Sequence, residues 1–271
     1  WGYNNIPMTF PSTSSGIGLS NKKIEIKDKI KDLMAGMGFA ESIHYSFISK
    51  SCCDRLGLAA DDDKRRMLDV LNPLTEDQAV MRTSLIPGLL ESMNRNQSWQ
   101  IKNIKIFELG KIFISNGQDA QPFEIEMLSA LWTGARLTPT WHGKPEPCDF
   151  YDLKGVVENL FSLLGIAGTS FTIMPASTCT FTKTGHSAIV SIHEKQIGII
   201  GEVSSSTLKN FDIKQPAFVF ELDVNKLIPL VPEFSSFESL PRFPAVERDI
   251  TLIVDNHAQA GDIVTQTESC G

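Results

Sequence analysis

The sequence contains no hydrophobic run long enough to cross a membrane. A membrane-spanning helix needs about 20 consecutive apolar residues, and no stretch of the 271-residue chain approaches that length. We therefore expect neither a membrane span nor a membrane partner.

Cysteine is scarce, and its spacing excludes a zinc site built on paired cysteines. The five cysteines are Cys52, Cys53, Cys148, Cys179 and Cys270, and the only close pair is adjacent in the sequence. The Cys-x-x-Cys spacing of structural zinc sites is therefore absent. An odd, scattered set is typical of reduced thiols in the cytosol, so we predict free thiols and a cytoplasmic location.

Positive charge is in deficit. The chain has 25 basic and 32 acidic residues and a formal net charge of −7, which gives no overall attraction to a nucleic-acid backbone. Any nucleic-acid contact would have to come from a local basic patch, and Lys102, Lys105 and Lys111 are the best position for one.

The common catalytic motifs are missing. There is no GxxxxGK[ST] phosphate loop, no HExxH pair and no GxSxG nucleophile elbow. His186 lies just before an expected strand, and an independent enzyme that uses it with Asp152 and Glu202 is the less favoured alternative. We predict no catalytic residue, no cofactor-binding residue and no metal ligand in the chain itself.

What the sequence does contain is ordinary globular composition, with 42% hydrophobic residues and a mean hydropathy of −0.06. Apolar spacing predicts helices over 21–37, 84–97 and 153–164, the second with Ser84 as its N-cap. Strands are predicted over 43–48, 101–109, 123–132, 187–193, 196–203 and 218–222. Strands with few helices and antiparallel connections favour an α+β fold.

The two ends and one charged run are interpreted as connections. Residues 7–20 are rich in Pro, Gly and Ser, which predicts a linker. The chain opens on Trp1 without an initiator Met, so we expect a piece of a longer protein. A cluster of prolines over 229–244 predicts a domain boundary, with a strand at 248–254 and a helix from Gln259 beyond it. The charged run 61–66 is interpreted as a solvated loop without chemistry.

A series of short blocks follows along nearly the whole chain. The blocks are Gly38-Phe39-Ala40-Glu41 with Tyr45-Ser46-Phe47, Leu71-Asn72-Pro73-Leu74-Thr75-Glu76-Asp77, Met81-Arg82-Thr83-Ser84-Leu85-Ile86-Pro87-Gly88-Leu89-Leu90, Phe107-Glu108-Leu109-Gly110, Asp149-Phe150-Tyr151-Asp152-Leu153-Lys154-Gly155, Gly185-His186-Ser187-Ala188, Ile199-Ile200-Gly201-Glu202-Val203, Phe220-Glu221-Leu222-Asp223 and Phe243-Pro244-Ala245-Val246-Glu247-Arg248-Asp249-Ile250. In this order and spacing the chain resembles the β subunit of bacterial phenylalanyl-tRNA synthetase.

The resemblance implies an α+β fold: a class II aminoacyl-tRNA synthetase-like antiparallel sheet flanked by helices, followed by the truncated start of a ferredoxin-like domain. It divides the chain into three parts. Residues 1–20 are the linker and the exit of a preceding domain, 21–230 are a catalytic-like module, and 231–271 are a linker and the start of an anticodon-binding domain.

The resemblance also implies a catalytically silent module. The second class II motif uses a strand arginine on the α-phosphate, but here Arg82 starts the expected helix and Lys105 lies on the strand. The third motif should end in an arginine, yet residues 219–226 contain neither glycine nor arginine. Adenylate formation depends on such positive charge. We interpret Arg82 as a buried or interface arginine bonded to main-chain carbonyls.

The parent enzyme implied by the resemblance joins phenylalanine to its tRNA with ATP and magnesium, as two α and two β chains, with the chemistry on α. The module would pair with α and reach the tRNA through the holoenzyme; a stand-alone tRNA-binding module is the alternative. Apolar content beyond what one helix and one strand need predicts the subunit interface. The residues assigned to it are Phe39, Glu41, Tyr45, Phe47, Arg82, Ile86 and Leu89.

Overall fold

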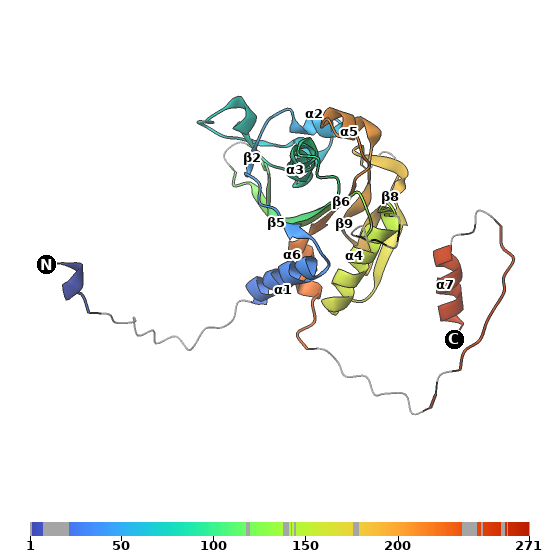
Figure 1. Ribbon diagram of the computed structural model, residues 1–271. Coiled ribbons are helices and arrows are strands. Elements are labelled where there is room, and N and C mark those ends of the chain that lie inside the picture. Colours follow the sequence, from blue (N-terminus) through green and yellow to red (C-terminus); the bar gives the residue numbers. More distant parts are fainter. Residues whose placement is uncertain are drawn as a thin grey trace. The chain divides into compact units, whose positions relative to one another are not determined.

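The computed structural model describes residues 2–7, 22–117, 120–137, 141, 143, 145–175, 179–234, 243–244, 246–255, 258 and 260–270. The chain divides into two compact units, Trp1–Phe234 and Ser235–Gly271 (Figure 1). The division of the chain into domains at these positions stays a prediction. In the described part of the chain, no helix is long and apolar enough to cross a membrane.

The larger unit is built on a sheet whose described part has seven strands in the order β1-β5-β6-β10-β9-β8-β7. β1 pairs with β5 in parallel, and every other pairing in the sheet is antiparallel. The predicted antiparallel sheet is therefore confirmed. Its strands are β1 (Ala40–Glu41), β5 (Ile104–Ile114), β6 (Phe123–Thr133), β7 (Thr169–Ile173), β8 (Thr182–Ile192), β9 (Lys195–Val203) and β10 (Phe218–Asp223).

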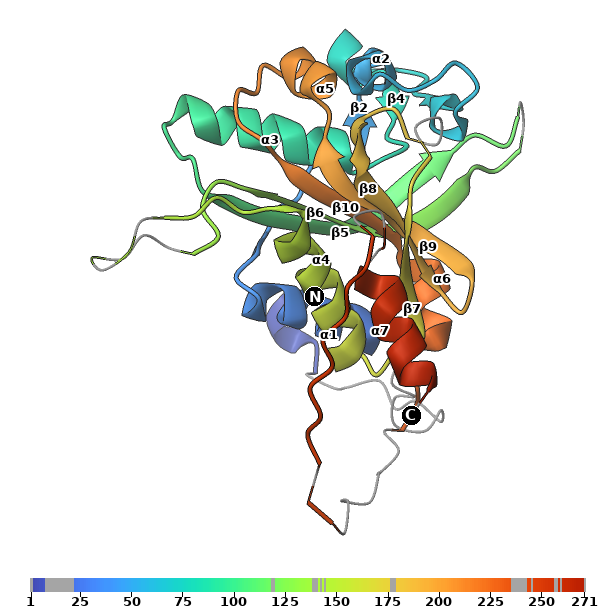
Figure 2. The ribbon, with the colours of Figure 1, turned by 90° about the vertical axis from the view of Figure 1, so that its right-hand side faces the viewer.

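Two long helices, together with the short helix α6 (Val224–Leu227), cover one face of this sheet, here called the α1 face (Figure 2). α1 (Lys22–Gly36) buries Ile26, Ile30 and Met34, which recur every four residues along one side of the helix. α4 (Phe150–Leu163) buries a similar stripe, and both stripes share a core with alternate residues of β6 and β10. The helix predicted from the spacing of residues 153–164 is confirmed.

The opposite face, here called the α3 face, carries α3 (Ile86–Ser98), α2 (Cys52–Leu56) and α5 (Ser205–Asn210) (Figure 2). A small sheet in the order β2-β4-β3 precedes α3. The remaining elements of this unit are β2 (Phe47–Ile48), β3 (Leu68–Asp69), β4 (Val80–Met81), and the 3-10 turns η1 (Tyr3–Asn5), η2 (Asp63–Arg65), η3 (Glu76–Gln78) and η4 (Ile228–Leu230).

In the larger unit, local structure departs from the predictions around the small sheet and at the start of α3. The strand expected over 43–48 is reduced to β2, because residues 43–46 do not join the small sheet. The helix expected to be capped by Ser84 begins at Ile86, although the Ser84 hydroxyl does accept the Ile86 N–H at 3.2 Å. The strands predicted over 187–193 and 196–203 do form a hairpin, β8–β9, but it turns through His193 and Glu194, both with left-handed φ (47° and 66°) as a type I′ turn requires.

The smaller unit contains one helix in its described part, α7 (Ala260–Ser269), which confirms the helix expected from Gln259. The strand expected over 248–254 is wrong, because residues 246–255 have neither strand nor helix. An isolated β-segment does not form without a partner to bond its backbone, and the described residues of this unit supply none. The linker predicted over 7–20 lies outside the described residues apart from its first residue.

Candidate functional site

Three polar side chains lie side by side in the middle of the large sheet. Ser129 of β6 is the direct partner of Glu108 on β5 and of Glu221 on β10. Directly opposed residues in antiparallel strands project from the same face, here the α3 face, because their neighbours Phe107, Leu128 and Phe220 are on the α1 face. We call Glu108, Ser129 and Glu221 the polar row. All three are buried.

Glu221 is surrounded by donors from the chain itself. Its Oε2 accepts the Lys64 ammonium at 2.6 Å, and its Oε1 accepts the Ser84 hydroxyl at 2.7 Å and the Leu85 N–H at 2.9 Å. Burial of the carboxyl raises its pKa, but the Lys64 charge and these hydrogen bonds lower it more, so the pKa of Glu221 lies below its ordinary value. The buried carboxylate is ionised and has its donors already in place.

Glu108 has the same design with different partners. Its Oε1 accepts Arg82 Nη1 at 2.6 Å, and its Oε2 lies 2.5 Å from His44 Nδ1. Burial of this carboxyl raises its pKa, but the hydrogen bond to His44 and the charge of Arg82 together lower the pKa by more than burial raises it. The pKa of Glu108 is therefore below its ordinary value. The second carboxylate of the polar row is therefore also neutralised from within the chain.

Arg82 lies between β4 and α3, which corrects the expectation that it starts the helix. Its Nε donates to the Lys111 carbonyl at 2.8 Å, and its Nη1 to the His44 carbonyl at 3.4 Å. The guanidinium passes directly over Gly110, where a Cβ would lie 2.5 Å from Nη2. The interpretation of Arg82 as a buried arginine bonded to main-chain carbonyls is confirmed.

Lys64 is a residue of this site that the sequence analysis did not predict. It belongs to the charged run 61–66, which was interpreted as a solvated loop, yet its Nζ reaches Glu221 across 157 positions of sequence and lies 5.3 Å from the Phe181 ring centroid. Burial lowers the pKa of Lys64, but Glu221 raises it more and holds the side chain charged. The available signal was Glu221 itself, since an acid inside an apolar strand requires a cationic partner.

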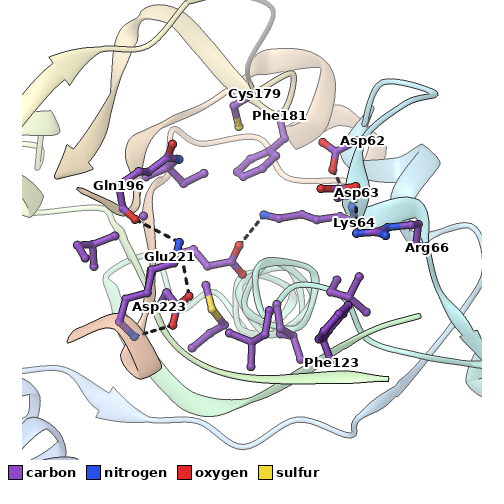
Figure 3. Close-up of a pocket in the computed structure, with 18 residues that line it drawn as sticks. Asp62, Asp63, Lys64, Arg66, Phe123, Cys179, Phe181, Gln196, Glu221 and Asp223 are labelled. Carbon is purple, nitrogen blue, oxygen red and sulfur yellow. Dashed lines mark hydrogen bonds and ion pairs between the residues drawn. The ribbon is translucent and has the colours of Figure 1, made fainter. Parts of the chain in front are cut away.

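A cavity of about 380 Å³ opens beside the polar row on the α3 face (Figure 3). Each of its three lining cations is paired: Lys64 with Glu221, Arg66 with Asp63 at 3.1 Å, and Lys226 with Asp223 at 3.8 Å. Within the described residues, no group of three or more His, Cys, Asp and Glu side chains is arranged to hold a metal ion. The apolar floor is formed by Ile112, Ile114, Phe123, Ile125, Met127, Ile197 and Ile199.

The residues predicted to form a subunit interface fall into two groups. Phe39, Ile86 and Leu89 are 3%, 0% and 0% exposed, so these side chains belong to the core of this chain. This corrects the exposure expected of them, because α3 and the turn after α1 use their apolar sides to cover the large sheet. Arg82 is buried as described above. The exposed group is Glu41, Tyr45 and Phe47.

The structure adds exposed apolar side chains near this second group. Ile43 precedes β2, while Leu71 and Leu74 lie in the loop between β3 and η3, and all three are at least 85% exposed. Both sets flank the small sheet: Ile43 and Tyr45 precede β2, and Leu71 and Leu74 follow β3, the two strands that pair with β4. We call Ile43, Tyr45, Phe47, Leu71 and Leu74 the apolar patch.

The alternative enzyme site is not assembled. His186 Nδ1 lies 3.1 Å from Glu202, so two of its three residues do meet at the surface. Asp152 instead accepts Arg136 at 2.8 Å and forms a capping box with Asp149 at the start of α4. It is a helix-start residue, where an acid interacts favourably with the helix dipole.

The three lysines of the predicted basic patch are not all free to bind a nucleic acid. Lys105 Nζ lies 3.6 Å from the centroid of the Trp132 ring, and Lys111 is paired with Glu124 at 2.6 Å. Two of the three lysines therefore already contact side chains of this chain.

The cysteines are free, as predicted, and the four in the larger unit are buried. Burial raises the pKa of Cys52 to about 11 and that of Cys148 to about 12. A thiol with so high a pKa stays protonated near neutral pH, so neither is a nucleophile there.

This antiparallel sheet with one parallel edge strand and helices on both faces has the fold of class II-like aminoacyl-tRNA synthetases. A crystal structure of pyrrolysyl-tRNA synthetase from Desulfitobacterium hafniense superposes with a TM-score of 0.59 at 18% identity, over 76% of this chain and 68% of that one. A second structure, of Desulfitobacterium hafniense PylSc, a pyrrolysyl-tRNA synthetase, superposes with a TM-score of 0.56 at 17% identity, over 76% of this chain and 65% of that one.

Residues 6–224 match the family described as the CLM domain of the phenylalanyl-tRNA synthetase beta chain, and the chain belongs to this family. The phenylalanine–tRNA ligase beta subunit of Syntrophotalea carbinolica is 37% identical over 97% of this chain and 32% of its own length. The phenylalanine–tRNA ligase beta subunit of Geobacillus kaustophilus is 32% identical over 100% of this chain and 33% of its own length. The chain thus spans about a third of the length of the curated relatives it matches.

Proposed function

We propose that this chain is a catalytically silent, class II-like module of the β subunit of a phenylalanine–tRNA ligase. The observation that carries the proposal is the filled polar row: Arg82 and Lys64 already neutralise Glu108 and Glu221. Phosphoryl chemistry needs positive charge that is free to stabilise the transition state. The cations that line the cavity are all engaged with carboxylates, so a nucleoside triphosphate would find no free cation there.

ATP–pyrophosphate exchange tests this directly. The full-length β chain alone should neither exchange nor bind ATP in calorimetry, whereas the chain assembled with α should exchange. Lys64→Met in the assembled enzyme should leave the exchange rate within about twofold, because the lysine serves packing of the module rather than ATP. Stoichiometric ATP binding with turnover by β alone would overturn the proposal.

We further propose that the apolar patch, with Glu41 at its edge, pairs with the α chain in an assembly of two α and two β chains. Its five apolar side chains, all in or next to the small sheet, are each at least 43% exposed, and apolar side chains left exposed in this way mark an interface. Leu71→Asp with Leu74→Asp should abolish co-purification with α. Ile173→Asp on the edge strand β7, where the side chain is 61% exposed, is the matched control and should leave it intact.

The remaining roles follow from membership of such an enzyme. ATP and magnesium would act on the α chain, the phenylalanine tRNA would be reached through the holoenzyme, and the assembly would work in the cytoplasm.

We also propose that residues 231–271 begin a ferredoxin-like domain, which is supported by α7 and by the greater length of the relatives. In the full-length protein, residues 248–254 should then be protected from amide exchange as a paired strand. Rapid exchange there would contradict this assignment.

A further inference from the structure

A serine, a histidine and a glutamate form a continuous relay outside the cavity. His44 Nε2 lies 2.6 Å from the Ser92 hydroxyl, and its Nδ1 lies 2.5 Å from Glu108 Oε2. The three come from different places in the fold: the loop between β1 and β2, the middle of α3, and β5. Nucleophile, base and orienting carboxylate in hydrogen-bond reach of one another are the geometric criterion for an activated nucleophile.

The imidazole lies in the orientation that such a relay needs, with the Glu108 carboxylate on Nδ1 and the Ser92 hydroxyl on Nε2. The neutral ring with its proton on Nδ1 donates to Glu108 and accepts the proton of the Ser92 hydroxyl at Nε2. Gly88 makes room for the ring, because a Cβ there would lie 2.8 Å from His44 Cγ. Arg82 holds the other carboxylate oxygen at 2.6 Å and prevents Glu108 from turning away.

The relay reaches the surface. Ser92 is half-buried, and the His44 side chain is 18% exposed. The neighbours of His44 in sequence, Ile43 and Tyr45, are 85% and 77% exposed and give the surroundings an apolar character. A small, uncharged electrophile can therefore approach the Ser92 hydroxyl from solvent.

We propose that Ser92 is an activated nucleophile that takes an acyl group from activated carboxylic esters, with His44 as general base and Glu108 as the positioning carboxylate. The Ser92 Oγ attacks the ester carbonyl, and its proton passes to His44 Nε2. The new Oγ–C bond forms as the C–O bond to the leaving group breaks. His44 then gives the proton to the departing alkoxide or aryloxide, so the products are acyl-Ser92 and an alcohol or phenol.

The position of Ser92 decides how far the reaction goes. In the middle of α3, backbone N–H groups are bonded within the helix and are not free to stabilise an oxyanion. Serine hydrolases instead place the nucleophile where such donors are free. The acyl group is therefore taken up once and released slowly, and the measurable product is a stable adduct rather than turnover.

The test uses the full-length protein without its partner, so the result does not depend on the proposed function. It is treated with a fluorophosphonate probe, from which fluoride leaves as the Oγ–P bond forms, and separately with p-nitrophenyl acetate. Intact mass and peptide mapping should place one adduct on Ser92. Ser92→Ala and His44→Gln should each slow labelling at least tenfold.

Ser98→Ala, in the same helix, is the matched control and should label as the wild type does, since the Ser98 hydroxyl donates only to the Asn94 carbonyl. Circular dichroism and thermal melting verify folding. If His44→Gln does not fold, the Ser92→Ala comparison decides alone, because alanine is tolerated at a half-buried helix position. Equal labelling of the wild type and Ser92→Ala, an adduct at another residue, or no adduct on the wild type would each overturn the proposal.

Discussion

Glu108 and Glu221 are ionised side chains inside a sheet, where removing one member of a buried ion pair costs about 3–5 kcal/mol. Each is neutralised by a cation from a segment that precedes α3: Arg82 for Glu108, and Lys64 for Glu221. At the scale of residues, these two pairs fasten the loops before α3 onto the sheet.

Lys64→Met should therefore destabilise the protein by about 2–3 kcal/mol, which is at or below the low end of the range of about 3–5 kcal/mol, because the Lys64 side chain is 23% exposed and water partly compensates for the lost pair. Urea unfolding measures the change. Lys226→Met, which removes a more exposed cation from the same cavity, should cost about 0.5 kcal/mol or less. The double variant Lys64→Met, Glu221→Met should recover part of the loss. A single variant as stable as the wild type would mean that the pair has no net role.

Acid should weaken the fold in a defined window. The folded-state pKa of Glu108 and of Glu221 is lowered, so each contributes stability above the unfolded value of about 4.3 that is lost as the pH falls through the lower folded value. The free energy of unfolding should hold between pH 7 and 5 and decline below about pH 4. Glu221→Gln should show a shallower decline, whereas Glu124→Gln at the exposed surface should keep the wild-type slope. Parallel curves for all three would contradict the assignment.

At the scale of elements, two glycines in regular structure have opposite surroundings. Gly110 in β5 lies under the Arg82 guanidinium, whereas a Cβ at Gly155 in α4 would meet nothing within 4 Å. Gly110→Ala forces the arginine or the strand to move and should cost about 1–3 kcal/mol. Gly155→Ala should stabilise the protein by about 0.5–1 kcal/mol, because alanine loses less entropy in a helix. Thermal unfolding of both variants checks the pair, and equal effects would contradict it.

Elements with a local signature were predictable. The apolar stripe of α4 and the hairpin β8–β9 depend on residues close in sequence, and both follow from periodicity and turn chemistry. The polar row could not be predicted in this way, because the register that aligns Glu108, Ser129 and Glu221 is set by pairing between strands that are distant in the sequence. Phe39 was predicted to face a partner but is buried in this chain. Composition shows that a side chain is apolar, but it does not show whether the chain itself covers that side chain.

At the scale of the whole molecule, the two units should differ in local stability. α7 buries none of its residues, and residues 246–255 have no strand or helix to protect their amides. Strands β6 and β10, in contrast, are buried almost throughout. Hydrogen exchange on this 271-residue piece should be fast after about residue 244 and slowest in β6 and β10. Equal protection in both regions would mean that the smaller unit is stabilised by contacts that the larger one provides.

The strand order has a consequence for how the chain folds. β5–β6 and β8–β9 are hairpins between consecutive strands, whereas β10 must insert between them after the whole segment 134–217 has been made. Nearby segments pair before distant ones because closing a long loop costs more entropy. During synthesis we therefore expect the two hairpins to form as separate halves, and the sheet to close only when β10 has left the ribosome and with it Glu221, the last carboxylate of the row.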